Sequence, residues 1–258
     1  MKTLELSLTE VHNKCSDMLK DIINLCEKNQ ITYFAIYGTL LGAIRHNGPI
    51  PWDPDVDLYV PDHEIPLLID AVNTQLNNKY WVDYRQKGDY PKAFPRIGYK
   101  GYETSILHID IFRMSGLPDN YNERMRITRK GNRLRIIRRL KDKSVNNEVD
   151  KTLKAKLLKT LVYFIPTNWI IKEIDNLCGK YRTFSTNYVG RVLGNGAIYE
   201  ASKFSSYILM PYDNFEIRVP VGYDSLLKQM YGDYMQYPPE AERRKFEEAI
   251  YVIKPLKK

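Results

Sequence analysis

The pattern of apolar and polar positions predicts alternating helices and strands over the first part of the chain. Apolar side chains recur at helical spacing from Leu8 to Cys26, after a Ser7–Glu10 pair that has the form of a capping box. The β-branched and aromatic stretch 31–37 predicts a buried strand. The same reasoning predicts helices at 39–46 and 61–76, a loop at 47–52, and strands at 56–60, 80–85, 94–100 and 105–114.

From residue 121 the pattern becomes helical, first basic and then amphipathic, up to about residue 181. Residues 182–222 predict irregular structure with short strands, followed by helices near Tyr223 and after Pro238 and Pro239. There is no internal repeat and no low-complexity linker. We therefore expect one domain over residues 1–258, with a core at 1–120, a helical section at 121–181 and a C-terminal section at 182–258.

The net charge of +8 is concentrated in one segment. Residues 124–143 hold ten Lys or Arg and one Asp, a net charge of +9, so the rest of the chain is near neutral. This distribution favours a local contact with an anionic partner and argues against a charge field that wraps a long nucleic acid. The alternative is a solvated cationic face of a helix, packed through Leu134, Ile136, Ile137 and Leu140.

No stretch has the roughly 18 to 20 apolar residues that are needed to cross a bilayer. The most apolar one, residues 161–171, is eleven residues long and is interrupted by Pro166 and Asn168. Together with the basic segment 124–143 it would allow peripheral contact with an anionic membrane. The three cysteines show no metal-binding spacing, which predicts reduced, buried thiols in a cytoplasmic protein.

Three aspartates stand within five positions, at Asp53, Asp55 and Asp57. On a strand, residues two apart point to the same side, so Asp55 and Asp57 would form a ligand pair for a hard divalent cation. Asp110 lies between two isoleucines on another predicted strand and would complete a three-carboxylate cluster if the strands are neighbours. Each motif is weak alone, because acidic turns are common and a strand aspartate can simply point outward.

Such a cluster, holding Mg²⁺ or Mn²⁺, suits the cleavage of a phosphoanhydride. The metal neutralises phosphate charge, and a third carboxylate can take a proton from an attacking hydroxyl. Upstream, Gly38 and Thr39 at a strand-to-helix turn would offer backbone N–H groups and a hydroxyl to a phosphate. Arg45 would add a positive side chain nearby.

The order of these motifs is similar to the pattern of the nucleotidyltransferase superfamily. The stretch GTLLGAIRHNGPIPWDPDVDL (38–58) resembles the signature of the LicD family, and VPVGYDSLLKQMYGDYMQYPP (219–239) resembles its C-terminal block. The family includes bacterial phosphocholine transferases and, more distantly, the fukutin-related ribitol-phosphate transferases. The resemblance implies an α+β fold with a nucleotidyltransferase-like mixed sheet flanked by helices.

The resemblance also implies an activity: transfer of a phospho-alcohol from a CDP-linked donor to a hydroxyl of a cell-surface glycan, such as lipopolysaccharide, capsule or teichoic acid, with release of CMP. On that interpretation Asp55, Asp57 and Asp110 bind the metal. Gly38, Thr39 and Arg45 would contact the donor, and Trp52 and Asp53 would shape the entrance. Two departures from the family pattern are Pro54 within an Asp run and the absence of a histidine shortly after Pro239.

Two other functions stay open. A nucleotidyltransferase that places NMP on a small molecule or an RNA end would use the same carboxylates, so only its product distinguishes it. A non-catalytic protein that binds RNA or membranes through residues 124–143 would leave the aspartates unexplained. That segment also lacks the interleaved aromatic side chains of a platform for single-stranded nucleic acid.

Overall fold

The computed structural model describes residues 2–85, 92–141, 160–193, 197–241, 243 and 249–256. The elements follow in the order β1 (Leu4–Leu6), α1 (Leu8–Lys28), β2 (Phe34–Ala35), α2 (Tyr37–His46), β3 (Asp57–Pro61), η1 (Asp62–Glu64), α3 (Ile65–Gln75), β4 (Tyr80–Asp83), β5 (Arg96–Tyr99), β6 (His108–Leu117), α4 (Tyr121–Lys141), α6 (Thr167–Cys178), β7 (Tyr188–Gly190), β8 (Ile198–Glu200), η3 (Ala201–Phe204), β9 (Tyr207–Tyr212), β10 (Phe215–Pro220), α7 (Tyr223–Tyr231) and β11 (Tyr251–Ile253). Helices and a mixed sheet give the α+β class that the sequence predicts.

The chain forms two compact units. The first contains Met1–Tyr84, Phe94–Arg113 and Glu200–Lys258, and the second contains Arg85–Ala93 and Met114–Tyr199. Most of the predicted C-terminal section, from Glu200 on, therefore packs with the N-terminal core, whereas residues 182–199 belong to the second unit. The longer segment of the second unit begins inside β6, at Met114, whereas the sequence pattern placed the end of the core section near residue 120.

In the first unit the strands lie in the order β2-β3-β6-β5-β4. In the second unit, β7 pairs with the second half of β6, and β8 pairs with β7. The pairs β2–β3, β4–β5 and β5–β6 are antiparallel. In the last of these, Arg96 is directly opposite Asp110. The predicted strand at 31–37 is reduced to the two residues of β2, although its neighbours Tyr33 and Ile36 are also buried.

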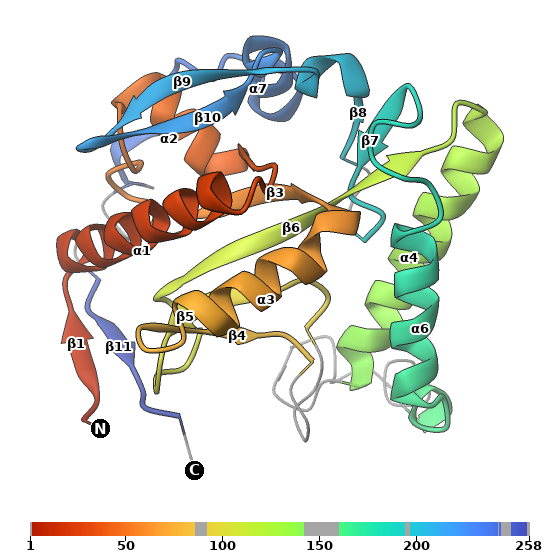
Figure 1. The fold of residues 1–258 in the computed structure, drawn as a ribbon, viewed down its shortest axis with the longest axis horizontal. Coiled ribbons are helices and arrows are strands. Elements are labelled where there is room, and N and C mark those ends of the chain that lie inside the picture. The colour runs from red at the N-terminus through yellow and green to blue at the C-terminus, as the bar shows by residue number, and fades with distance from the viewer. Residues whose placement is uncertain are drawn as a thin grey trace. The chain divides into compact units, whose positions relative to one another are not determined.

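Helices α1 and α3 contact each other on one side of this sheet (Figure 1). The capping box at the start of α1 is confirmed, because the Ser7 hydroxyl accepts from the Glu10 N–H and the Glu10 carboxylate accepts from the Ser7 N–H. The apolar stripe of α1 is buried, including Cys15 and Cys26 as free thiols. This amphipathic helix forms where periodicity and capping agree.

The β9–β10 hairpin packs against β2 and α2. At its tip, the Asp213 N–H donates to the carbonyl oxygen of Asn47 at 2.8 Å, and the Ser16 hydroxyl donates to Asp213 Oδ2 at 2.5 Å. The hairpin thereby fixes the end of α2 and the loop that follows it. Near the chain ends, β1 pairs with β11 in antiparallel register, a pairing that the sequence pattern did not indicate.

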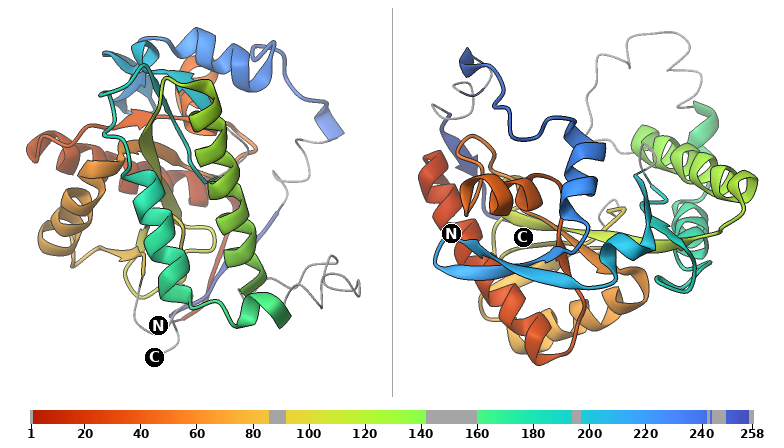
Figure 2. Two further views of the ribbon diagram at one scale, coloured as in Figure 1. Left: turned by 90° about the vertical axis from the view of Figure 1, so that its right-hand side faces the viewer. Right: turned by 90° about the horizontal axis from the view of Figure 1, so that it is seen from above.

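In the second unit, α4 and α6 lie side by side (Figure 2). The basic segment is helical up to Lys141, as predicted, and its last two residues lie outside the described residues. Arg124 is buried rather than solvated, and its Nη1 donates to the carbonyl oxygens of Pro118 and Asp119 at 2.7 and 2.9 Å. A Cβ at Gly131 would lie 2.1 Å from the carbonyl oxygen of Val192, so α4 needs a glycine there.

Most of the helix predicted after Pro239 lies outside the described residues. Of the helices that the structure describes, none combines the length and the apolar character that a membrane-spanning segment requires.

Candidate active site

The Gly-Thr turn is the first turn of α2, directly after β2. The chain enters it through Tyr37, whose φ of 50° is in the left-handed region that few non-glycine residues adopt. Thr39 is buried, and its hydroxyl accepts a hydrogen bond from the backbone N–H of Asp57 at 2.8 Å. Thr39 therefore holds the first residue of β3 against α2, while its predicted contact with a phosphate stays a prediction.

Asp53 turns its carboxylate back toward the start of α2. Its Oδ1 accepts from the Asp55 N–H at 3.1 Å, and a Cβ added at Gly38 would lie 2.7 Å from its Oδ2. The carbonyl oxygen of Asp53 is 2.9 Å from His12 Nε2. Burial raises the pKa of the Asp53 carboxyl; the Asp55 N–H lowers it, and the Asp55 charge raises it. Asp53 is thus a carboxyl group held in a fixed place.

Asp55 and Asp57 lie where the chain enters β3. Asp55 is exposed and precedes the strand, whereas Asp57 is the first strand residue and is half-buried. The Asp110 N–H donates to the carbonyl oxygen of Val56 at 2.9 Å, so the start of β3 lies beside Asp110 on β6. The two acidic strands, β3 and β6, are therefore neighbours, as the sequence-based prediction required for the three aspartates to come together.

The carboxylate of Asp110 has close basic partners. Its Oδ1 accepts from Arg96 Nε at 2.8 Å and is 3.2 Å from His108 Nε2. Arg96 also donates from Nη1 to the carbonyl oxygen of Thr104 at 3.0 Å. His108 is buried, and its Nδ1 has no hydrogen-bond partner in the part of the chain that the structure describes. In this arrangement Asp110 is an ion-pair partner whose charge Arg96 already offsets.

Within the described ranges, no three His, Cys, Asp or Glu side chains come together as a group that could hold a metal ion. Mg²⁺, however, is usually bound by only one or two carboxylates together with water and substrate phosphates. Asp55 and Asp57 supply the hard oxygen donors that Mg²⁺ or Mn²⁺ prefers, one of them exposed. The residues present fit such an ion, and the metal-binding role of Asp55, Asp57 and Asp110 stays a prediction.

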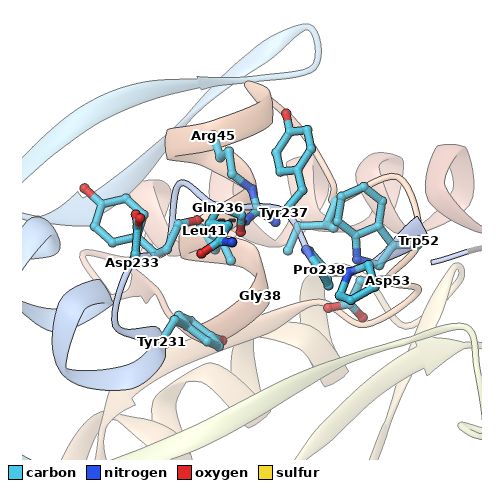
Figure 3. A pocket seen from close by; sticks show the side chains of 13 residues that line it. Gly38, Leu41, Arg45, Trp52, Asp53, Tyr231, Asp233, Gln236, Tyr237 and Pro238 are labelled. Atoms are coloured by element: carbon cyan, nitrogen blue, oxygen red, sulfur yellow. Dashed lines mark hydrogen bonds between the residues drawn. The ribbon is translucent and has the colours of Figure 1, made fainter. Parts of the chain in front are cut away.

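A pocket of about 480 Å³ opens in the first unit beside these residues. Its lining comes from Gly38, Leu41, Arg45, Ile50, Trp52, Asp53, Tyr231, Asp233, Tyr234, Gln236, Tyr237, Pro238 and Pro239 (Figure 3). The two blocks that resemble the family signature are far apart in the sequence, and here they form the two sides of one cavity. We call it the Trp52 pocket.

Arg45 joins the two sides of the Trp52 pocket. Its Nη1 donates to the carbonyl oxygens of Tyr234 and Gln236 at 2.7 and 3.3 Å, and its Nε donates to His46 Nε2 at 3.0 Å. The guanidinium lies 4.9 Å from the ring centroid of Tyr237. Burial lowers the pKa of Arg45, which at neutral pH stays charged.

Aromatic rings line the outer part of the pocket. The rings of His46 and Tyr237 stack with their centroids 5.5 Å apart, and Trp52 meets both rings edge-on at 5.5 and 5.7 Å. Arg243 lies over Trp52 at 5.1 Å from its ring centroid. Two guanidinium groups and three rings thus form a cationic and aromatic cluster, of which Arg45, Trp52 and Tyr237 line the pocket.

Sequence reasoning placed Gly38, Thr39, Arg45, Trp52 and Asp53 in the substrate site, beside the three predicted metal-binding aspartates. The structure brings Gly38, Arg45, Trp52 and Asp53 together in the lining of the pocket; Thr39, Asp55, Asp57 and Asp110 are not among the lining residues.

Sequence reasoning missed the contributions that come from other parts of the chain, which are His12, Arg96, Tyr231, Asp233, Tyr234, Tyr237 and Arg243. Of these, Tyr231 feels the charges of the acidic residues. Burial raises the pKa of its hydroxyl, and the negative charges of Asp57 and Asp53 raise it further. The only sequence signal for the side of the pocket formed by residues 231–239 was the resemblance of the stretch 219–239 to the C-terminal block of the family.

The sequence is similar to a known protein family and to individual known proteins. Residues 30–135 match the family model described as LicD/FKTN/FKRP, nucleotidyltransferase domain. A Haemophilus influenzae protein named lipopolysaccharide cholinephosphotransferase LicD is 27% identical over 254 residues, which cover 93% of this chain and 96% of that protein. An uncharacterized protein of Rickettsia typhi is 51% identical over 91 residues, covering 35% of this chain and 28% of its own length.

The family match spans the Gly-Thr turn, the aspartates of β3 and Asp110, and the similarity to the Haemophilus protein extends to the C-terminal side of the pocket. The chain therefore carries a LicD-family domain over residues 30–135, and the resemblance found in its sequence is confirmed.

Proposed function

We propose that this protein is a phosphotransferase that moves a phospho-alcohol, phosphocholine or a polyol phosphate, from a CDP-linked donor to a hydroxyl of a cell-surface glycan and releases CMP. The observation that carries the proposal is the Trp52 pocket, in which Gly38, Arg45 and Asp53 meet the Tyr231–Pro239 segment. The name of the Haemophilus relative makes choline the first alcohol to test and lipopolysaccharide the first glycan.

The donor would lie along the cationic side of the pocket. Arg45 uses Nη1 and Nε for its bonds to the protein, and among the described residues its Nη2 has no hydrogen-bond partner. This group and the guanidinium of Arg243 can bind phosphate oxygens. A bound Mg²⁺ or Mn²⁺, held by Asp55 and Asp57 with Asp110 nearby, would offset the phosphate charge and fix the phosphorus for in-line attack.

In the reaction that we propose, an acceptor hydroxyl attacks the phosphorus that carries the alcohol, and the anhydride bond to CMP breaks. The hydroxyl proton passes to a carboxylate, for which Asp57 and Asp110 are the candidates. The backbone N–H of Asp57 donates to the hydroxyl of the buried Thr39, and the carboxylate of Asp110 accepts from Arg96. We take Asp57 as the first of the two to test.

The alcohol is the least constrained part of the donor. Aromatic faces and carboxylates suit a quaternary ammonium group, and the pocket offers Tyr231, Asp53 and Asp233. The faces of Trp52 and Tyr237, however, already have guanidinium groups over them, which would repel a cation. A choline group would therefore bind near Tyr231, and a neutral polyol could use either side.

A nucleotidyltransferase remains the alternative function, because it would use the same carboxylates and the same metal. A non-catalytic binding protein is the third possibility. The product separates all three, because phospho-alcohol transfer gives CMP, nucleotidyl transfer gives pyrophosphate, and binding alone gives neither.

The test incubates the purified protein, with and without Mg²⁺ or Mn²⁺, with CDP-choline, CDP-ribitol, CDP-glycerol and nucleoside triphosphates, each with an envelope glycan acceptor. We expect metal-dependent release of CMP from one CDP-alcohol and loss of that release in Asp55→Asn and Asp57→Asn. Asp70→Asn, an exposed aspartate on α3, is the matched control and should keep full activity. Pyrophosphate as the product, or full activity in Asp57→Asn, would overturn the proposal.

A further inference from the structure

The turn that precedes α6 in the second unit exposes a dense group of large apolar side chains. The exposed fractions are 61% for Leu161, 75% for Tyr163, 77% for Phe164 and 47% for Trp169. Single exposed apolar residues are normal on a protein surface, but contiguous groups mark interaction sites. We call residues 161–169 the aromatic turn; it lies at one end of the α4–α6 pair (Figure 2).

The aromatic turn is held in place by buried and bonded groups. Val162 is buried at 4% exposure and anchors the turn from inside. Lys141, the last residue of α4, donates from Nζ to the carbonyl oxygens of Val162, Tyr163 and Ile165 at 3.3, 3.1 and 2.6 Å. The rings of Tyr163 and Phe164 meet edge-to-face, with centroids 5.7 Å apart. The exposed rings therefore project from a fixed backbone.

The helix that ends at the aromatic turn has a basic outward face. Arg126, Arg129, Arg133 and Ile136 recur at intervals of three or four residues and are all exposed, so they share one side of α4. The only acidic residue of α4 is Glu123, and it is paired with Lys180 at 2.7 Å. Lys141 joins the end of this basic helix to the aromatic turn.

We infer that the aromatic turn and the basic face of α4 bind the surface of an anionic lipid membrane. Tyr and Trp side chains favour the boundary between lipid headgroups and acyl chains, where the ring is in apolar surroundings and the polar atom is in water. Arginines beside them would contact lipid phosphates, and their attraction to an anionic leaflet adds to the apolar contribution. The combination of exposed rings with three exposed arginines on one helix face distinguishes a lipid surface from a neutral apolar partner.

This inference goes beyond the proposed transferase activity and does not depend on it. It refines the expectation drawn from the sequence, which combined the basic segment 124–143 with residues 161–171. In the structure the groups that would enter the lipid are those of the aromatic turn, and the helix supplies the surrounding charge.

The test is flotation of the full-length protein with vesicles of phosphatidylcholine alone and of phosphatidylcholine mixed with phosphatidylglycerol. We expect binding to the anionic vesicles that weakens with added salt. The double variant Tyr163→Ser/Phe164→Ser should bind at least about tenfold more weakly than the wild type, because apolar burial drives interfacial insertion. Arg129→Glu/Arg133→Glu should abolish the preference for anionic vesicles. Leu67→Ser, at a 47% exposed leucine on α3, is the matched control and should bind as the wild type does.

A second measurement needs no folded double variant. The emission of Trp169 should shift to shorter wavelength when anionic vesicles are added to the wild type, and Trp169→Phe should lose that shift. Equal vesicle binding by the wild type and a folded Tyr163→Ser/Phe164→Ser variant would overturn the inference. So would a dimer in sedimentation experiments that this variant dissociates, because the turn would then be an interface between copies of the chain. Transfer to a water-soluble glycan, assayed in parallel, reports on the transferase proposal separately.

Discussion

Gly38 and Asp53 are in such close contact that a Cβ at residue 38 would lie 2.7 Å from Asp53 Oδ2 and 3.7 Å from its Cγ. Gly38, the glycine of the Gly-Thr turn, is therefore required because the Asp53 carboxylate approaches it closely. A left-handed backbone is not the reason, because the φ of Gly38 lies outside that region. The strained residue at this turn is its neighbour Tyr37. The contact links the start of α2 to the acidic loop before β3.

Gly38→Ala is expected to displace the Asp53 carboxylate and reduce kcat/KM for phospho-alcohol transfer by about 10- to 100-fold, since small misplacements in a site are costly. Overpacking should lower the free energy of unfolding by about 1–3 kcal/mol. Steady-state kinetics and urea unfolding measure the two effects. In the background of Asp53→Ala, Gly38→Ala should cost much less stability. An equal cost in both backgrounds would show that the contact with Asp53 is not the cause.

The helices were predictable from the sequence because their signals are local. The capping box at Ser7 and the apolar period of α1 specify that helix within a few residues of its observed bounds. Strand ends were less predictable, because they depend on pairing. Asp55 was expected to share a strand with Asp57, yet β3 begins only at Asp57, where the backbone meets β2 and β6.

Of the two sides of the Trp52 pocket, only the side formed by residues 38–53 was predictable from the sequence. The signature at residues 38–58 placed four of the pocket residues, but no period or spacing relates that stretch to Tyr231–Pro239. Their meeting follows from the way the C-terminal section packs against α2, which Arg45 completes by bonding to the Tyr234 and Gln236 carbonyl oxygens. The pairing of Asp110 with Arg96 similarly depends on the register of two strands.

The hydrogen bond from the Asp57 N–H to the Thr39 hydroxyl gives a second prediction. Thr39→Val keeps the shape of the side chain but leaves a partly buried N–H without its acceptor, which should cost about 1–3 kcal/mol of stability and most of the activity. Thr39→Ser loses only a buried methyl group, at a cost of about 1 kcal/mol, and should stay active. Thermal unfolding and CMP release compare the two. Equal activity of the Val and Ser variants would contradict a positioning role for this hydroxyl.

The pKa of His12 gives a prediction about pH. Burial lowers it below its ordinary value of 6.5, so the unfolded chain takes up this proton before the folded chain does. As pH falls through 6.5, the free energy of unfolding should therefore decrease, by at most about 1.4 kcal/mol per pH unit for one proton. His12→Gln cannot titrate, and its urea-unfolding free energy should fall less steeply between about pH 7 and pH 5. Identical slopes for the two proteins would contradict the shift.

Asp110 has two possible roles, as a carboxylate of the reaction and as the ion-pair partner of Arg96. The side chains of both residues are largely buried, at 13% and 26% exposure. Removing one partner leaves the other charge uncompensated, and removing both relieves that penalty. The two roles therefore predict different outcomes for single and double variants.

Asp110→Asn should lower the free energy of unfolding by about 1–3 kcal/mol, less than for a fully buried pair because both groups keep some contact with water. The double variant Asp110→Asn/Arg96→Gln should recover most of that stability. If Asp110 takes part in the reaction, the double variant stays inactive in the CMP-release assay despite its recovered fold, while Arg96→Gln alone retains measurable turnover because the carboxylate is still present. If the double variant recovers turnover together with stability, Asp110 is a structural residue, and the carboxylates of Asp55 and Asp57 are sufficient for the reaction.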